Sequence, residues 1–434
     1  MKVTNVTRVA CGLAVALGLT VGLGTPPAQA QSGPRYTVAD LGTLGGDSFA
    51  LDINLQGQIT GTFRDASGNE QAFLYSGGVM TALGTLGGSY SYGYAINQLG
   101  DIAGDSETAG GLQHAYLWSG GVMTDLGTLG GGRSQANGIN TSGQVVGWAY
   151  LASGTWRAFL FQNGVMADIG TTFDGWSIAT DINDLGHVVG YYQAGGGTRP
   201  FVWIDGNLPP LGTLGGNVGG ANKINLSGDI AGWSSYADNK ARPVLFRGGS
   251  PVDLGTLGGD DGQAWGINDL GHAVGYSLTT DGRWHALLYY GGVLYDLNDL
   301  SQANTRVELM AATAIDGLGR IVGYGCFRGQ LSGRTCNGGQ IRAVLLRPTG
   351  GQALQDLSQL IGQLGLPNGT ANSLLAKLNS ALRCANRANL VCLCGSLTAF
   401  GNEVSAQAGK ALTEEQANQL LAAAESLRAM VGCR

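Results

Sequence analysis

The sequence predicts a mainly β protein, a seven-bladed β-propeller of repeats about 43 residues long, followed by a small all-α domain braced by disulfides. The first reason is that three short motifs recur along the chain in a fixed order. The second is that glycine makes up 76 of the 434 residues and charged residues only 12%, which is typical of a β protein rich in tight turns. The third is negative: there is no Gly-X-Y period, and 44% of the residues are hydrophobic, which excludes collagen and a disordered linker.

Each repeat carries the same three motifs. Leu-Gly-Thr-Leu-Gly-Gly, usually preceded by Asp, is intact at residues 40–46, 83–88, 125–131, 211–216 and 253–259. Ile-Asn-x-x-Gly has its Ile at positions 53, 96, 139, 182, 224 and 267, and appears as Ile-Asp at 315. A polar or basic residue, Ala or Pro, and three bulky apolar residues begin at Gln71, His114, Arg157, Arg199, Arg242, His285 and Arg342. The second motif is spaced by 43, 43, 43, 42, 43 and 48 residues, a period that indicates a propeller or a solenoid.

Four short strands fit within each repeat. In the second repeat we expect them at residues 93–97, 101–105, 114–118 and 122–127. Gly100 and the pair Gly120-Gly121 stand where tight turns need a positive φ. Strands of this length are not stable alone, so neighbouring sheets must cover their faces.

The order of the strands favours a closed ring. The first copy of the fourth strand, residues 36–41, precedes the first inner strand, whereas the last repeat loses its pattern at 347–350. An N-terminal strand that completes the last blade closes a propeller and leaves only short edges exposed. We therefore predict seven blades of four strands. The alternative, a β-solenoid with two coils per repeat, leaves the displaced strand unexplained.

These motifs closely resemble the bacterial extracellular HAF repeats, which are named after a His-Ala-Phe tripeptide. That element stands here as His114-Ala115-Tyr116 and Arg157-Ala158-Phe159, beside the Asp-Leu-Gly-Thr-Leu-Gly-Gly motif. The resemblance covers roughly residues 34–347 and implies a secreted protein. The family has no agreed catalytic residues, so the resemblance transfers no active site.

The N-terminal residues 1–30 are predicted to be a secretory signal peptide. Lys2 and Arg8 precede the apolar stretch 9–23, and Ala28-Gln29-Ala30 has the small-x-small pattern of a cleavage site. The alternative is an uncleaved anchor, but this stretch is shorter than the ~20 residues that span a bilayer. We expect a secreted or periplasmic protein with a propeller at 31–350 and a helical module at 351–434.

The charge balance argues against nucleic-acid partners. Without residues 1–30, 22 basic residues face 30 acidic ones, a net charge of −8. An acidic surface of this kind offers no electrostatic footprint for DNA or RNA and disfavours anionic membranes.

The C-terminal module is rich in Ala and Leu, and helical periodicity predicts helices at 353–364, 370–388 and 413–431, with a short one at 395–405. Its four cysteines are Cys384, Cys392, Cys394 and Cys433. Cys392 and Cys394 are too close to pair easily, which leaves two connectivities, and we favour Cys394–Cys433 with Cys384–Cys392. The remaining pair, Cys326 and Cys336, lies in a long loop of the last repeat, where a disulfide is expected; zinc is the less favoured alternative, because no His accompanies these cysteines.

No catalytic constellation is legible in the sequence, so no catalytic residue, metal or cofactor is predicted. His187 and His272 share one repeat position, and His114 and His285 share another, so these histidines are expected to point outward from separate blades. A calcium loop at 181–186 is less favoured than an ordinary Asx turn, because Leu185 occupies a ligand position.

The best candidates for ligand binding are aromatic. The residue that ends the second strand of each repeat is aromatic in five repeats: Trp148, Tyr191, Trp233, Tyr276 and Tyr324. On one face of a propeller these rings would form platforms for sugars or peptides. The alternative is that they pack between blades.

We therefore expect a non-enzymatic binding or scaffold protein with a glycan or protein ligand. One alternative is a propeller hydrolase or lyase, which would need the channel acids Asp52, Asp181 and Asp316 to converge. Another is a self-associating surface protein.

Overall fold

Seven antiparallel sheets follow one another along the chain and form the seven blades of a β-propeller. The computed structural model describes residues 33–433 except 172, 174, 302–305, 334, 338 and 388. The predicted signal peptide lies outside the described residues. Because each inner strand contacts the inner strands of both neighbouring blades, the seven sheets close into a ring.

The strands are numbered in chain order, and in blades 1 to 6 the first strand of each blade is the inner one. Blades 1 to 3 contain β2 (Ser48–Ile53), β3 (Ile59–Arg64), β4 (Glu70–Ser76), β5 (Val79–Ala82), β6 (Gly87–Ile96), β7 (Ile102–Thr108), β8 (Gln113–Ser119), β9 (Val122–Asp125), β10 (Gly130–Ile139), β11 (Val145–Leu151), β12 (Trp156–Gln162) and β13 (Val165–Asp168). Blades 4 to 6 contain β14 (Ser177–Ile182), β15 (Val188–Ala194), β16 (Gly197–Trp203), β17 (Gly219–Ile224), β18 (Ile230–Ser235), β19 (Ala241–Arg247), β20 (Ser250–Asp253), β21 (Gly258–Ile267), β22 (Ala273–Thr279), β23 (Trp284–Tyr290) and β24 (Val293–Asp296).

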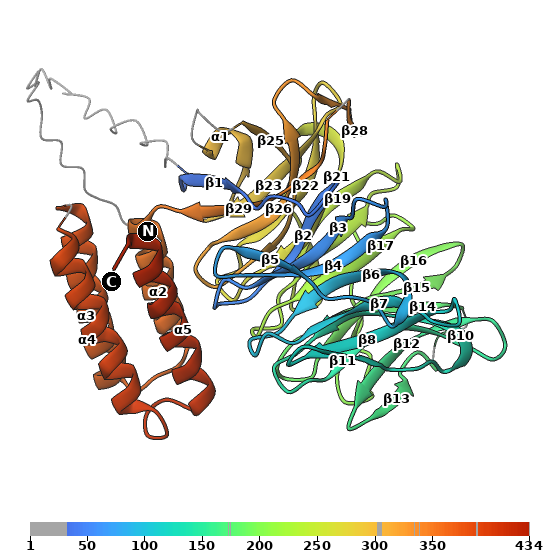
Figure 1. Ribbon diagram of the computed structural model, residues 1–434, viewed down its shortest axis with the longest axis horizontal. Coiled ribbons are helices and arrows are strands. Elements are labelled where there is room, and N and C mark those ends of the chain that lie inside the picture. Colours follow the sequence, from blue (N-terminus) through green and yellow to red (C-terminus); the bar gives the residue numbers. More distant parts are fainter. Residues whose placement is uncertain are drawn as a thin grey trace, which may run out of the picture. The chain divides into compact units, whose positions relative to one another are not determined.

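The seventh blade is closed by the start of the chain, as predicted. It contains β25 (Val307–Ile315), β26 (Ile321–Phe327) and β29 (Arg342–Pro348), and its outer strand is β1 (Tyr36–Asp40). β1 pairs antiparallel with β29 from Tyr36 opposite Pro348 to Asp40 opposite Val344, and Figure 1 shows the two strands side by side. Tyr36 is buried in the core of this blade, so the closure is stabilised by packing as well as by the ladder.

The fourth blade departs from the prediction of four strands. Its sheet has three, β14, β15 and β16, and the fourth strand is reduced to an isolated bridge between Phe201 and Pro210. Two consecutive prolines, Pro209 and Pro210, stand at this position. Because proline has no N–H, a ladder of hydrogen bonds cannot extend through them.

The Asp-Leu-Gly-Thr-Leu-Gly-Gly motif is a folded corner between blades. In the third blade's copy, the Asp125 carboxylate accepts a hydrogen bond from the Gly127 N–H, and the Thr128 hydroxyl donates to the Gly131 carbonyl. Gly127 has a φ of 74°, which disfavours any other residue. A Cβ on Gly131 would lie 2.5 Å from the Tyr150 side chain, so the last glycine permits a close crossing of strands.

A buried serine joins each of four blades to its neighbour. The Ser91 hydroxyl accepts from the Ala72 N–H at 2.9 Å and donates to the Gly84 carbonyl. The equivalent contacts are made by Ser48, Ser134 and Ser177. In these four blades the serine links the third motif of the preceding blade to the inner strand that follows it.

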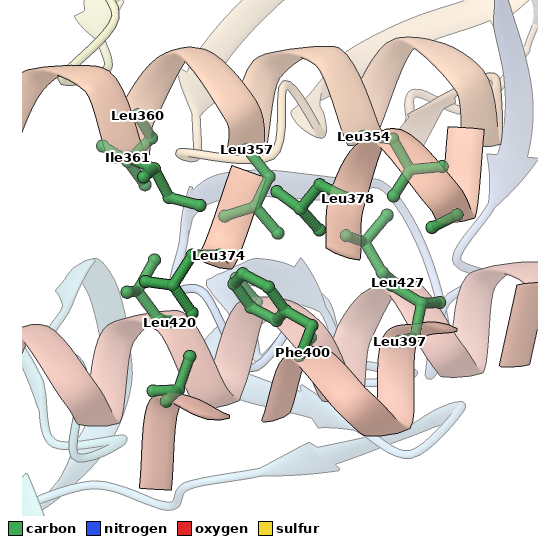
Figure 2. Packing of buried hydrophobic residues seen from close by; sticks show 14 of the residues in the cluster. Leu354, Leu357, Leu360, Ile361, Leu374, Leu378, Leu397, Phe400, Leu420 and Leu427 are labelled. Atoms are coloured by element: carbon green, nitrogen blue, oxygen red, sulfur yellow. The ribbon is translucent and has the colours of Figure 1, made fainter. Parts of the chain in front are cut away.

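The helical module follows the propeller directly. Apart from the short α1 (Leu297–Leu300), the helices are α2 (Gly350–Gln363), α3 (Asn368–Asn386), α4 (Leu390–Gln407) and α5 (Glu414–Val431). Figure 2 shows their apolar side chains meeting in one core around Phe400, Leu357 and Leu378. Propeller residues Leu55, Leu270 and Leu318 belong to the same cluster, so the module packs on blades 1, 6 and 7. Among the described residues, none of the helices combines the length and apolarity needed to cross a bilayer.

Helix α4 is longer than the predicted 395–405. The Asn389 side chain caps it by accepting from the Cys392 N–H, and Gly395 is accommodated inside the helix. Thr413 and Gln416 form a capping box at the start of α5, because they exchange side-chain to backbone hydrogen bonds. Gly432, with a φ of 82°, follows the last residue of α5, where a left-handed glycine commonly ends a helix.

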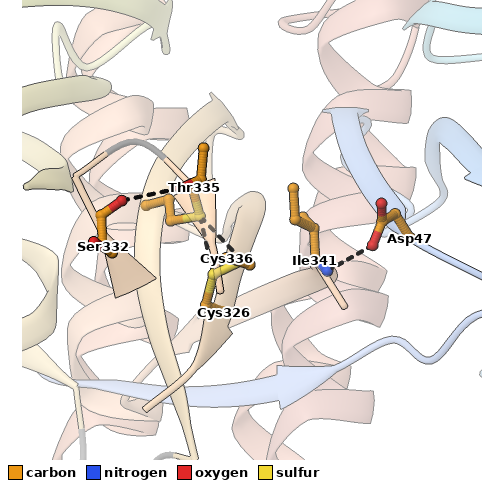
Figure 3. Close-up of a disulfide and its surroundings, with 7 residues drawn as sticks. Asp47, Cys326, Ser332, Thr335, Cys336 and Ile341 are labelled. Atoms are coloured by element: carbon orange, nitrogen blue, oxygen red, sulfur yellow. Dashed lines mark hydrogen bonds between the residues drawn. A yellow bond between two sulfur atoms is a disulfide. The ribbon is translucent and has the colours of Figure 1, made fainter. Parts of the chain in front are cut away.

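All three predicted disulfides are present. Cys394–Cys433 and Cys384–Cys392 brace the helical module, with Cα–Cα distances of 5.5 Å and 5.6 Å. Cys326–Cys336 closes the insertion of the last blade, which carries the small hairpin of β27 (Leu331–Ser332) and β28 (Thr335–Cys336). Figure 3 shows this disulfide beside the contact of the Ile341 N–H with Asp47 of blade 1.

Candidate functional site

The Ile-Asn-x-x-Gly motif forms a ring of hydrogen bonds around the central channel. In blade 2 the Asn97 Oδ1 accepts from the N–H groups of Leu99 and Asp101, which folds the turn, and its Nδ2 donates to the Asn140 carbonyl of the next blade. The same donation to the next blade is made by Asn54, Asn140, Asn183, Asn225 and Asn268. We call these residues the asparagine ring, and the distances lie between 2.9 and 3.2 Å.

An ion pair completes this ring in blade 7. Asp316 replaces asparagine there and has no N–H to donate. Its carboxylate pairs with Arg320 at 2.5 Å, and the guanidinium donates to the carbonyls of Asn54 and Leu55 of blade 1. Both side chains are buried. Asp316 is therefore committed to closing the ring and does not converge with the other two predicted channel acids.

A β-bulge in each inner strand aims one side chain into the channel. The register of all seven inner strands shifts at the residue two positions before the motif Ile or its equivalent. A bulge leaves one residue unpaired and redirects its side chain. We call these the bulge residues: Leu51, Tyr94, Asn137, Thr180, Asn222, Trp265 and Thr313.

The seven bulge residues line one cavity of about 330 Å³, which we call the front cavity. Trp148 and Tyr191, from the second strands of blades 3 and 4, also line it. Its polar lining comes from amides, hydroxyls, Asp52 and Lys223. The site thus combines aromatic rings, neutral hydrogen-bonding groups and the charged side chains of Asp52 and Lys223.

Two of the predicted channel acids do converge. Lys223 Nζ lies 3.3 Å from Asp52 Oδ2 and 3.4 Å from Asp181 Oδ1, which joins blades 1, 4 and 5 across the channel. We call these three residues the channel triad. Asp52 and Lys223 line the front cavity and also a second cavity of about 160 Å³, which we call the rear cavity. The triad therefore lies in the channel between the two cavities. Leu360 of α2 and Gln419 of α5 line the rear cavity.

Burial and charge act in opposite directions within the triad. Burial raises the pKa of Asp181 to about 6, although Lys223 and the Ile224 N–H favour its ionised form. For Lys223, burial by itself would lower the pKa, but the charges of Asp181 and Asp52 outweigh it and raise the pKa above its usual range. Asp52 accepts from the Ile96 N–H at 3.1 Å and Asp181 from the Ile224 N–H at 2.9 Å. Both carboxylates are therefore already engaged by a cation and by backbone.

The five predicted aromatic residues are not equivalent. Trp148 and Tyr191 line the front cavity, whereas Trp233 lies against the backbone of Gly220. Tyr276 is buried, with its ring centroid 4.9 Å from Trp265 and 4.5 Å from Trp284. Tyr324 packs edge-on against Phe49 at 5.1 Å, and burial raises its pKa to about 12. Of the five, only Trp148 and Tyr191 line the front cavity, and ligand binding by these aromatic residues remains a prediction.

The histidines have separate structural partners. His114 Nδ1 lies 2.8 Å from Asp125, and His285 lies between Asp296 and Glu308. His272 packs on the Tyr290 ring at 4.3 Å, and burial lowers its pKa to about 4. The backbone N–H of His187 donates to the Asn183 Oδ1.

The loop considered for calcium is an ordinary turn. Asn183 Oδ1 accepts from the Leu185 and His187 N–H groups, while Asp184 accepts from the Thr141 N–H and hydroxyl of blade 3. In the part of the chain that the structure describes, no group of three or more His, Cys, Asp or Glu residues is placed to hold a metal ion.

Sequence reasoning missed Tyr94, Trp265 and Lys223. The repeat contains the signal for all three. The position before the motif Ile is small in four blades, where it is Ala95, Gly138, Gly266 and Ala314, and charged only at Asp52, Asp181 and Lys223. The bulge residue stands one position earlier, two residues before the Ile. Aligning the repeats on this Ile therefore identifies the charged residues of the channel and the bulge residues together.

The comparisons with known proteins assign no function. No family model matches the chain, and no curated protein matches it. Among solved structures, TolB from Acinetobacter baumannii has a TM-score of 0.39 at 15% identity, covering 58% of this chain and 63% of that one. A Mycobacterium tuberculosis puromycin-hydrolysing peptidase has a TM-score of 0.42 at 13% identity, with coverages of 71% and 53%. The fungal lectin of Aleuria aurantia, described as a six-bladed β-propeller, has a TM-score of 0.32 at 14% identity, with coverages of 73% and 96%. This chain thus spans less than two thirds of TolB and of the peptidase.

Proposed function

We propose that this chain is a non-catalytic binding protein that acts outside the cytoplasm and takes a carbohydrate in the front cavity. The observation that carries the proposal is the composition of that cavity, where the rings of Tyr94, Trp148, Tyr191 and Trp265 alternate with amide and hydroxyl side chains. A sugar ring has apolar faces that pack on aromatic rings and hydroxyls that exchange hydrogen bonds with amides and charged groups. A volume of about 330 Å³ lies within the range of small-molecule sites.

The location rests on the cysteines and on the N-terminal sequence. Three disulfides persist best in an oxidising compartment, which supports a secreted or periplasmic protein. We also propose that the repeats belong with the bacterial extracellular HAF repeats. In support, the His114 of that tripeptide pairs with Asp125 of the Asp-Leu-Gly-Thr-Leu-Gly-Gly motif, which links the two signature elements.

The channel triad favours binding over hydrolysis. A hydrolase with two carboxyl groups needs one of them protonated and both accessible to the scissile bond. Here Asp52 and Asp181 share Lys223, and Asp181 is buried. The raised pKa of Asp181 is the one feature that a hydrolase would also show, so the test includes an assay for bond cleavage.

The test is a glycan array followed by calorimetry on the oxidised protein from residue 31. We expect the double variant Trp148→Ala/Tyr191→Ala to lose binding by at least roughly tenfold, because each ring contributes about 0.5–1.5 kcal/mol beyond its buried area. The matched control is Tyr236→Ala, an exposed tyrosine of blade 5 that lies outside the lining of the front cavity.

Three outcomes are informative. Retained binding in the double variant would place the ligand elsewhere. Absence of binding to any glycan, with a cooperative melting transition, would contradict the proposal. New reducing ends that disappear in Asp181→Asn would show a hydrolase instead.

A further inference from the structure

A line of aromatic rings leaves the front cavity and returns to it. Trp148 contacts Tyr150 at a centroid distance of 5.8 Å, Tyr150 contacts Trp156 at 5.6 Å, Trp156 contacts Trp176 at 5.7 Å, and Trp176 contacts Tyr191 at 6.0 Å. We call these five residues the aromatic ridge. Its two ends line the front cavity, whereas its three middle members do not.

The ridge is accessible to solvent along its length. All five side chains are half-buried, and none of them belongs to the buried core. Tyr150 and Trp156 lie directly opposite each other on β11 and β12, at the end of the hairpin that joins these strands. Trp176 stands just before β14 and joins this hairpin to blade 4.

The architecture of a blade does not require these middle rings. At the position of Tyr150 the other six blades carry Arg64, Glu107, Gln193, Ser235, Leu278 and Cys326. At the position of Trp176 they carry Asp47, Tyr90, Arg133, Val218, Asp261 and Glu308. No other blade carries large rings at all three positions: Tyr90 is the one ring of blade 2 here, and in blade 6 Trp284, at the position of Trp156, is accompanied by Leu278 and Asp261. Because those blades still form their sheets, the fold of a blade does not require the three large rings that gather on blades 3 and 4.

We infer that the ridge is an extended subsite for a linear oligosaccharide, with one end of the chain in the front cavity and further sugar units over Tyr150, Trp156 and Trp176. The inference rests on the proposed function. A sugar chain presents an apolar face and a hydroxyl edge at every unit, which matches a series of half-exposed rings that ends in a cavity of amides and charges. A single sugar would occupy the cavity and leave the three middle rings unused. Apolar rings exposed in one continuous patch mark a binding surface.

The test uses a series from one to six sugar units of the glycan that the wild-type protein binds. We expect affinity to rise with each added unit and then level off, by roughly tenfold or more over the series. In Trp156→Ala/Trp176→Ala this rise should disappear, while affinity for the shortest ligand should change by less than about twofold. The control Tyr236→Ala should show the same increase in affinity with length as the wild-type protein. The conservative variant Trp156→Phe, which keeps an aromatic ring, should show most of that increase.

The outcomes separate this inference from the proposed function. If the wild-type protein binds the shortest sugar but gains nothing with length, the ridge is not a subsite, although the front cavity is. An equal loss for short and long ligands in the double variant would mean that the rings act only by supporting Tyr191. Binding of a peptide but of no glycan in the series would overturn both proposals.

Discussion

At the residue scale, one asparagine in each of the first six repeats performs two tasks. Its carbonyl oxygen folds the turn of its own blade, and its amide N–H group holds the next blade. These amides are buried, so each lost bond would leave a carbonyl of the neighbouring blade without its partner. This explains why Ile-Asn-x-x-Gly is the most regular motif of the sequence.

The variant Asn140→Ala tests this role. The change removes a bond to the Asn183 carbonyl and three bonds with Ser142 and Gln144 within the turn, so we expect a destabilisation of about 2–4 kcal/mol. The measurement is the melting temperature by calorimetry. Asn418→Ala, at an exposed position of α5, is the matched control and should melt like the wild-type protein. Equal melting temperatures for both variants would contradict the role.

At the element scale, an ionic latch holds the strands of blade 6 to the inner strand of blade 7. His285 of β23 lies 2.6 Å from Asp296 at the end of β24 and 3.2 Å from Glu308 of β25. Arg283 also pairs with Glu308. Burial alone would lower the pKa of His285, but the hydrogen bonds and charges of Asp296 and Glu308 outweigh it and raise the pKa.

The latch predicts a pH dependence. A raised pKa in the folded state means that the stabilisation is fully present below the unfolded-state pKa of about 6.5 and is lost as the pH rises through the folded-state value. We therefore expect His285→Gln to lower the melting temperature most near pH ~5, by a few degrees, and progressively less above neutrality. His187→Gln is the matched control. A difference that grows with rising pH would show that the sign is wrong.

At the scale of the whole molecule, the ring depends on its first strand. β1 supplies the outer edge of blade 7 and buries Tyr36, and the Thr349 N–H that precedes α2 donates to the Arg35 carbonyl. The first and last segments of the propeller are therefore held together. A propeller without this closure exposes a strand edge and part of its core.

Deleting Tyr36–Asp40 tests the closure. Because the edge of β29 and the pocket of Tyr36 become exposed, we expect a lower melting temperature and concentration-dependent association in light scattering. A synthetic peptide of residues 34–42 should reverse both effects by pairing with β29. A deletion variant that stays monomeric and melts at the wild-type temperature would refute the closing role.

Much of this fold was predictable because a repeat is a local signal. Seven copies of one period give seven blades, and the displaced strand at 36–41 identifies the closing strand. The cysteine spacing reduced the pairings of the helical module to two, and the favoured one is present together with the expected Cys326–Cys336 bridge. The candidate site was less predictable: Trp148 and Tyr191 line the front cavity, but Tyr276 is buried in packing and Lys223 was missed.

The sequence by itself determined the repeat, the number of blades and the ring closure, because these follow from contacts between neighbouring strands and repeats. It left two pairings open for the four cysteines of the helical module, and the structure has the favoured one. Only the tertiary structure decided which side chains meet across the channel. Asp52 and Lys223 are 171 positions apart in non-adjacent blades, and their contact exists because the ring closes. The direction of the bulge residues likewise depends on a register shift that a strict alternation of strand residues does not foresee. The tertiary packing also distinguishes Leu318, buried under the helical module, from the exposed Leu99 at the same repeat position.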